Sequence, residues 1–185
     1  MRFRKLNKFE DFVRRIVDSF NEMRIDYAFT GALAASYYGT PRTTIDVDVM
    51  VRVSEKELTS LVVALRKAGM EANERRIREV LKSGYKILTF KDKGSSFTLD
   101  VILSDKRFRK HSGSILGLST FYQVPEDLIL AKLRMIKATV PRERAQKDRE
   151  DVKAILKESG VNVDALKRRA RKEGTIKILE ELEED

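Results

Sequence analysis

The 185-residue sequence has no cysteine, no tryptophan, only three prolines and only nine glycines. Without cysteine there can be no disulfide framework, thiolate zinc site or cysteine nucleophile. No apolar run approaches the ~18–20 residues that a membrane-spanning helix needs, and no signal-peptide core follows the first residues, so we expect a cytoplasmic protein without membrane attachment. The scarcity of proline and glycine, together with regular hydrophobic periodicity, excludes a disordered chain. This length predicts one domain, or two packed sub-domains, with a sizeable core.

Positive charge exceeds negative charge, but the excess is uneven along the chain. There are 38 Lys and Arg residues against 29 Asp and Glu, a formal net charge of +9. Residues 1–65 are nearly neutral, residues 66–110 and 132–172 are strongly basic, and the last 13 residues are acidic. Two basic blocks are typical of a protein that binds a polyanion, either a nucleic acid or a nucleotide phosphate chain. The alternative is a solvated surface on a basic protein, which charge alone does not exclude.

Hydrophobic periodicity predicts an α/β front half and an all-helical back half. Helices are expected at 9–20, 32–38, 54–69, 126–140, 143–158 and 163–173. Strands are expected at 25–29, 45–53, 85–90 and 97–103, the last two joined as a hairpin. The resulting division is an α/β domain over 1–122 and a helical sub-domain over 123–185 that ends in a low-complexity acidic tail, 180–185.

The strongest local signal is a pair of carboxylates on a strand. Alternation places Asp46 and Asp48 on one face, with Cα atoms about 6.5–7 Å apart, opposite an aliphatic face of Ile45, Val47, Val49 and Val51. Two adjacent carboxylates repel unless a cation lies between them, and a divalent metal is the usual one. The alternative is that both acids are simply solvated.

Neighbouring residues favour the metal interpretation. Asp100 lies on the polar side of another apolar strand, and three strand-borne carboxylates could hold two Mg²⁺ (or Mn²⁺) ions about 3.5–4 Å apart. Thr30-Gly31 stands where a strand ends and a helix begins, and free N–H groups there favour a phosphate. Arg42 and Thr44 add a guanidinium and a hydroxyl directly before the acidic strand.

The segment from Thr30 to Val49 resembles the nucleotidyltransferases of the DNA polymerase β superfamily, and is most similar to the small stand-alone branch that includes the abortive-infection type toxin nucleotidyltransferases. The resemblance implies a nucleotidyltransferase-like mixed sheet with flanking helices. It also implies that Gly31 binds the triphosphate of an NTP and that Asp46, Asp48 and Asp100 bind Mg²⁺. The second residue of the family's glycine pair is Ala32 here, which removes a hydroxyl ligand.

The resemblance extends into the helical half, where the family has a Lys on one helix and a Lys-Asp pair on the next. Lys132, Lys147 and Asp148 match these positions. Lys132 and Asp148 also lie on the apolar sides of their predicted helices, where charges need partners. One reading places Lys132 against a substrate phosphate with Asp148 orienting it or acting as a base. The other is an ion pair that fastens two helices.

The sequence therefore predicts an enzyme that transfers a nucleoside monophosphate from an NTP, such as ATP, to an acceptor hydroxyl. Catalytic candidates are Asp46, Asp48, Asp100, Lys132 and Asp148; nucleotide-binding candidates are Thr30, Gly31, Ala32, Arg42, Thr44, Lys132 and Lys147. RNA, in particular tRNA, or a protein hydroxyl is the expected acceptor. The alternatives are an inactive nucleotide- or RNA-binding protein on the same fold, or a toxin–antitoxin component. His111 and Ser112–Ser114 are expected in a solvated loop.

Overall fold

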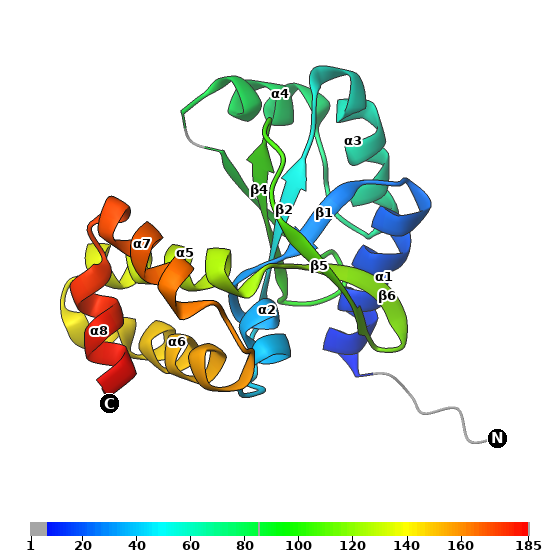
Figure 1. Ribbon diagram of the computed structural model, residues 1–185. Coiled ribbons are helices and arrows are strands. Elements are labelled where there is room, and N and C mark those ends of the chain that lie inside the picture. The colour runs from blue at the N-terminus through cyan, green and yellow to red at the C-terminus, as the bar shows by residue number, and fades with distance from the viewer. Residues whose placement is uncertain (1–6, 85, 185) are drawn as a thin grey trace. The chain divides into compact units, whose positions relative to one another are not determined.

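The computed structural model describes residues 7–84 and 86–184 (Figure 1). Within these residues it contains six strands and eight α-helices, which confirms the predicted mixed α/β class. The strands are β1 (Asp26–Phe29), β2 (Asp46–Arg52), β3 (Ile87–Lys91), β4 (Thr98–Ser104), β5 (Lys110–Ile115) and β6 (Leu118–Gln123). The helices are α1 (Lys8–Glu22), α2 (Gly31–Tyr38), α3 (Leu58–Lys67), α4 (Glu74–Lys82), α5 (Pro125–Ala138), α6 (Gln146–Glu158), α7 (Val163–Glu173) and α8 (Ile176–Glu184), with short 3-10 helices η1 (Glu55–Glu57) and η2 (Arg142–Ala145).

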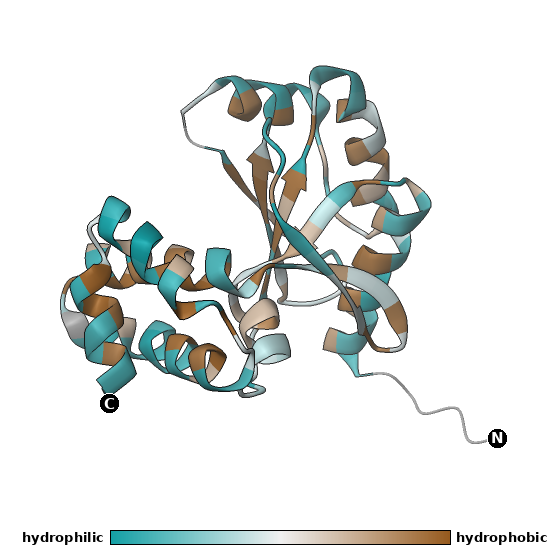
Figure 2. Cartoon of the chain, viewed as in Figure 1, coloured by the Kyte–Doolittle hydropathy of each residue, from teal (hydrophilic) through white to brown (hydrophobic). Residues whose placement is uncertain are grey.

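The six strands form one mixed sheet in the order β3-β4-β2-β1-β6-β5. β2 and β4 run parallel, whereas β1 pairs with β2 and β3 pairs with β4 in the antiparallel direction. Alternation along β2 is as predicted, because Val47, Val49 and Val51 are fully buried. Ile45 is 62% exposed because it precedes the first residue of the strand, so the buried aliphatic face begins at Val47. The apolar strands stand out against the polar outer faces of the helices in Figure 2.

Helix α1 packs with α3 on one side of these strands (Figure 1). Its apolar residues recur at helical spacing and are buried at Phe12, Val13, Ile16, Val17 and Phe20. Asn7 and Glu10 form a capping box at its start, which satisfies two of the free N–H groups there. The apolar stripe of α1 is therefore part of the core that covers the sheet.

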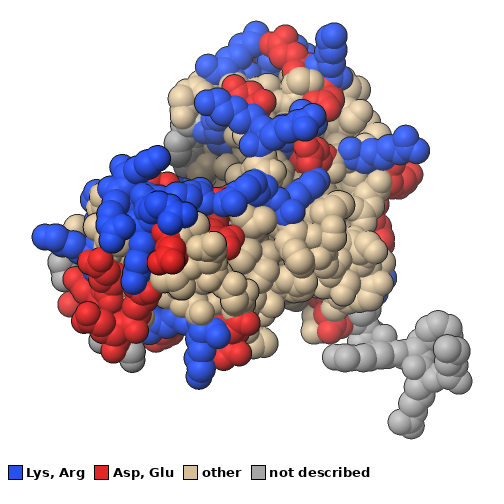
Figure 3. Space-filling model, in the orientation of Figure 1, with Lys and Arg blue, Asp and Glu red and all other residues tan. Residues whose placement is uncertain are grey.

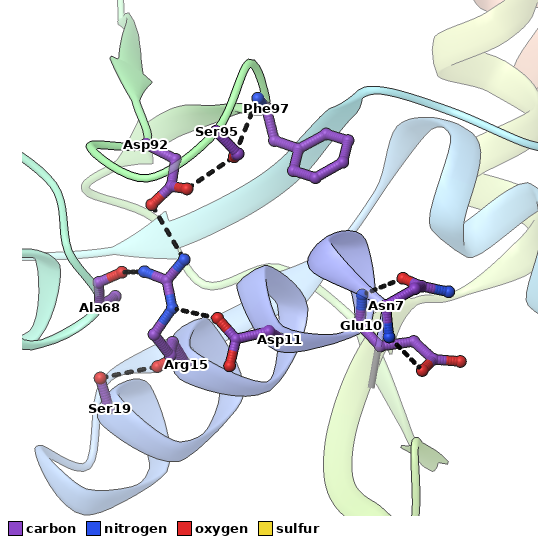
Figure 4. A network of polar contacts seen from close by, with 9 residues as sticks. All are labelled: Asn7, Glu10, Asp11, Arg15, Ser19, Ala68, Asp92, Ser95 and Phe97. Atoms are coloured by element: carbon purple, nitrogen blue, oxygen red, sulfur yellow. Dashed lines mark hydrogen bonds and ion pairs between the residues drawn. The ribbon is translucent and has the colours of Figure 1, made fainter. Parts of the chain in front are cut away.

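Arg15 of α1 ties three segments of this core together (Figure 4). Its guanidinium donates to the carbonyl oxygen of Ala68 after α3, and it lies 2.9 Å from Oδ1 of the buried Asp92 between β3 and β4. Ser95 Oγ donates to the other oxygen of Asp92 at 2.6 Å. Burial favours the neutral carboxyl, but the hydrogen bonds from Ser95 and Arg15 and the charge of Arg15 outweigh it and hold the pKa of Asp92 below its usual value.

Several elements differ from the sequence-based prediction. The predicted loop at His111 and Ser112–Ser114 is wrong, because these residues form β5, whose Ser114 carbonyl accepts a 3.1 Å hydrogen bond from Tyr122 on β6. The acidic tail is helical rather than an irregular segment, because residues 180–184 belong to α8, in which Leu179 and Leu182 are buried. The hydrophobic periodicity predicts no helix at α4, and Tyr85, the first residue of the strand predicted at 85–90, lies outside the described residues.

Contacts divide the chain into two compact units. The first comprises Met1–Thr30 and Thr44–Tyr122, and the second comprises Gly31–Thr43 and Gln123–Asp185. The chain therefore passes from one unit to the other three times. Among the helices of the described residues, none has the length and apolar character to cross a membrane.

Candidate functional site

An acidic face on the sheet of the first unit brings three predicted residues together. In the register of β2 and β4, Asp48 lies beside Asp100 and Asp46 lies beside Thr98. Residues paired in this way point to the same side of a sheet, and neighbouring strands are about 4.8 Å apart. The opposite side carries the buried Val47, Val49, Leu99 and Val101. The aliphatic core thus fixes the strands that present Asp46, Asp48 and Asp100 on their polar side.

The carboxylates of this face have unequal surroundings. Asp46 Oδ1 accepts a 2.5 Å hydrogen bond from the Thr98 hydroxyl, a partner that the sequence analysis did not identify. Asp100 Oδ1 is buried and has no hydrogen-bond partner among the described residues. An unsatisfied buried carboxylate oxygen is costly, so this atom marks a place where a cation would be stabilising.

The donor set fits a divalent cation, because Mg²⁺ prefers carboxylate oxygens. The described residues contain no group of three or more Asp, Glu, His or Cys side chains that could hold a metal ion as they stand. Asp48 and Asp100, which share one register position, are the two neighbouring carboxylates that could hold such an ion.

The segments before and after α2 are fixed by local hydrogen bonds. The Thr30 N–H donates to the Asp48 carbonyl oxygen at 3.0 Å, which holds the end of β1 beside the acidic strand. Gly31 begins α2 with φ +55°, a conformation that favours glycine. Ala32 is buried. The Thr44 hydroxyl donates to the Asp46 carbonyl oxygen at 2.9 Å and accepts from its N–H at 3.2 Å, so it shapes the turn into β2.

The second unit holds a separate network of charges. Lys132 Nζ lies 2.9 Å from Asp148 and 2.8 Å from Asp151, and its side chain is only 6% exposed. Asp151 also accepts two hydrogen bonds from Arg42, from Nε at 3.0 Å and from Nη2 at 3.1 Å. Three predicted residues, Arg42, Lys132 and Asp148, therefore belong to one network, whereas Lys147 is exposed.

Asp151 is the member of this network that the sequence analysis missed. The signal was present, since Asp148, Asp151, Val152 and Ile155 are spaced to share one stripe of α6. A carboxylate on a buried stripe needs a cationic partner. Lys132 and Arg42 supply that charge to Asp151.

Basic side chains gather over α7 of the second unit, and acidic ones over α8 (Figure 3). Part of this charge is neutralised, because Lys167 pairs with Glu183 at 3.0 Å and Arg169 pairs with Asp127 at 2.6 Å. Arg168, Arg171 and Lys172 remain exposed.

Solved structures of nucleotidyltransferases share this fold. The chain is similar to ANT(2″)-Ia in complex with adenylyl-2″-tobramycin, with a TM-score of 0.66, 14% identity, and coverage of 90% of this chain and 99% of that one. It is also similar to the lincosamide antibiotic adenylyltransferase LnuA in its lincomycin-bound form (TM-score 0.52, 12% identity, 82% and 99% coverage). An antigenic nucleotidyltransferase-like protein from Paracoccidioides brasiliensis gives a TM-score of 0.55 at 17% identity, with 82% and 77% coverage. No protein-family profile matches the sequence, and no curated protein matches it. The comparisons establish a nucleotidyltransferase-like fold.

Proposed function

We propose that this chain is a nucleotidyltransferase that moves a nucleoside monophosphate from an NTP to an acceptor hydroxyl with the help of Mg²⁺. The observation that carries the proposal is the pairing of Asp48 with Asp100 at one register position, with one oxygen of Asp100 buried and unsatisfied. This arrangement lies on a fold shared with ANT(2″)-Ia and LnuA.

The carboxylates have distinct roles in this reaction. A bound Mg²⁺ would neutralise charge on the triphosphate, and Asp46, Asp48 and Asp100 are the residues that would hold it. Asp100 would also accept the proton that the acceptor hydroxyl loses as its oxygen bonds to the α-phosphorus. The bond between the α-phosphorus and the bridging oxygen breaks, and pyrophosphate leaves. Such transfers depend mainly on positioning and charge neutralisation.

The phosphate-binding roles fall on residues of two kinds. Gly31 and Ala32 provide backbone N–H groups at the start of α2, where Thr30 leads into the helix. Arg42, Thr44, Lys132 and Lys147 provide side chains. Arg42 and Lys132 are engaged by Asp151 and Asp148, so a phosphate would have to compete with these carboxylates. If it does not, Lys132 instead fastens α5 to α6.

The test is incubation of the protein with each labelled NTP, Mg²⁺, and either total RNA or total cell protein. We expect label in one acceptor class with the wild type and at least a hundredfold less label with Asp48→Asn or Asp100→Asn, since electrostatic groups of this kind contribute about that much. The matched control is Asp105→Asn, which removes a carboxylate that is exposed and pairs with Lys86. Label that is equal in all variants, or absent from RNA, protein and small products, would contradict the proposal. Absent label with retained NTP binding would favour an inactive nucleotide-binding protein.

A further inference from the structure

A basic hollow runs along the free edge of β3, in the same unit as the acidic face. Two adjoining cavities of about 980 Å³ and about 510 Å³ share Glu71, Arg76 and Lys93 in their walls. The larger cavity adds residues from the end of α3 and the start of α4, and the smaller adds residues of β3. We name these two cavities together the β3-edge groove.

The groove begins next to the acidic face. Strand β3 pairs with β4 so that Thr89 lies beside Asp100 and Lys91 lies beside Thr98. Paired residues share a face, so Thr89 and Lys91 lie on the same side of the sheet as Asp100, on the edge strand β3. Thr89 and Lys91 also line the smaller cavity. Thr89, in the wall of the smaller cavity, is therefore one strand, about 5 Å, from Asp100.

The charge of the groove is positive after its internal pairs are formed. Its walls contain five basic residues and three acidic ones: Arg66, Arg75, Arg76, Lys91, Lys93, Glu71, Glu79 and Asp92. Each acid already has a cationic partner, since Glu79 pairs with Arg75, Glu71 pairs with Lys93, and Asp92 pairs with Arg15. Arg66, Arg76 and Lys91 remain without a carboxylate partner among the residues that the structure describes.

One of these cations is held in place. Arg66 donates from Nε at 3.1 Å and from Nη2 at 2.9 Å to the Ala72 carbonyl oxygen. A guanidinium has five N–H donors, so this contact orients the group and leaves donors for a ligand. Lys91 and Arg76 are exposed. Phe90, the aromatic residue of the walls, is only 6% exposed and offers no face on which a base could stack.

We propose that the β3-edge groove binds the phosphate backbone of a single-stranded RNA acceptor and leads its terminal hydroxyl to Asp100. The inference rests on the proposed function for the role of that hydroxyl, but the binding itself does not require catalysis. Several positive groups in the two adjoining cavities match the repeating charge of a polynucleotide. Because the contacts are to phosphates and no aromatic face is exposed, binding is independent of base sequence.

The test measures binding of a fluorescein-labelled 12-nucleotide RNA to the full chain by anisotropy, with Mg²⁺ and without NTP, over a series of salt concentrations. For the double variant Arg76→Ala/Lys91→Ala we expect a Kd ten- to a hundredfold higher than that of the wild type, equally for oligo(U) and oligo(A). The slope of log K against log salt should fall by about 1.4, since each phosphate contact on a single strand contributes about 0.7. Both side chains are exposed and have no carboxylate partner within residues 7–84 and 86–184, so folding should be unaffected.

The matched control is Lys56→Ala/Arg168→Ala, which removes the same charges from exposed positions on η1 and α7. An equal or greater loss of binding in this control overturns the proposal. The proposal is also overturned if Arg76→Ala/Lys91→Ala binds RNA as tightly as the wild type and the NMP is transferred to a protein. That result would still support the proposed function. RNA binding that depends on the groove without any NMP transfer supports the groove and counts against the proposed function.

Discussion

The Nζ atom of Lys132 lies 2.8 Å from Oδ2 of Asp151, and each of the two side chains is only 6% exposed. Asp148 and Arg42 extend this pair into a network of two cations and two carboxylates. The carboxylate between the two cations is Asp151, because both Lys132 and Arg42 contact it.

Removal of Asp151 should therefore destabilise the second unit strongly. We expect Asp151→Ala to lower the free energy of unfolding by about 3–5 kcal/mol, since it leaves Lys132 buried with a single, partly exposed partner. Asp148→Ala should cost about 1 kcal/mol, because Lys132 keeps Asp151. Urea unfolding followed by circular dichroism gives both values. Similar costs for the two variants would show that Asp151 is not the centre of the network.

Mg²⁺ should stabilise the wild type through the acidic face. At ten times its Kd the ion adds about 1.4 kcal/mol, which for a chain of this size raises Tm by about 3–6 °C. The increase should disappear in Asp100→Asn, whose unsatisfied carboxylate oxygen we assign to the ion. Thermal melts with and without Mg²⁺ check this, and Asp105→Asn should retain the full increase. Retention of the increase in Asp100→Asn would place the ion elsewhere.

The ion pair of Asp92 should make the first unit sensitive to acid. Its folded-state pKa is lower than the unfolded value of about 3.9, so the ionised carboxylate adds stability above about pH 4. This stability is lost as pH falls through the folded-state pKa. Asp92→Asn should cost about 1–3 kcal/mol at pH 7 and should show a weaker loss of stability between pH 4 and pH 2. Urea midpoints at several pH values test it, and parallel curves for wild type and variant would contradict it.

Gly69 should tolerate no side chain. Its φ is +94°, and a Cβ would lie 2.4 Å from Nη1 of Arg15, which is held by Ala68 and Asp92. We expect Gly69→Ala to cost about 1–3 kcal/mol through backbone strain and displacement of Arg15. The control is Gly84→Ala, where a Cβ would meet nothing within 4 Å and the cost should stay within about 0.5 kcal/mol. Equal thermal midpoints for the two variants would refute the expectation.

The parts of the fold with strong periodicity were predictable from sequence. The 2-residue period of β2 placed Asp46 and Asp48 on one face, and the 3.6-residue period of α5 placed Lys132 inward. The register that pairs Asp48 with Asp100 was not predictable, because it depends on which strands become neighbours. Strand β5 was missed because Lys110–Ile115 is polar and glycine-containing, and it is held by its pairing with β6 rather than by its own propensity.

The three passages of the chain between its units have a consequence for dissection of the protein. Residues 31–43 belong with the C-terminal helices although they lie between β1 and β2 in sequence. A fragment that ends at residue 122 would keep α2 but lose α6, whose Ala154 lies against Gly39. Neither unit is a continuous stretch of sequence, so neither can be exchanged between proteins by a single crossover. Recombination or truncation would therefore have to keep both segments of each unit together.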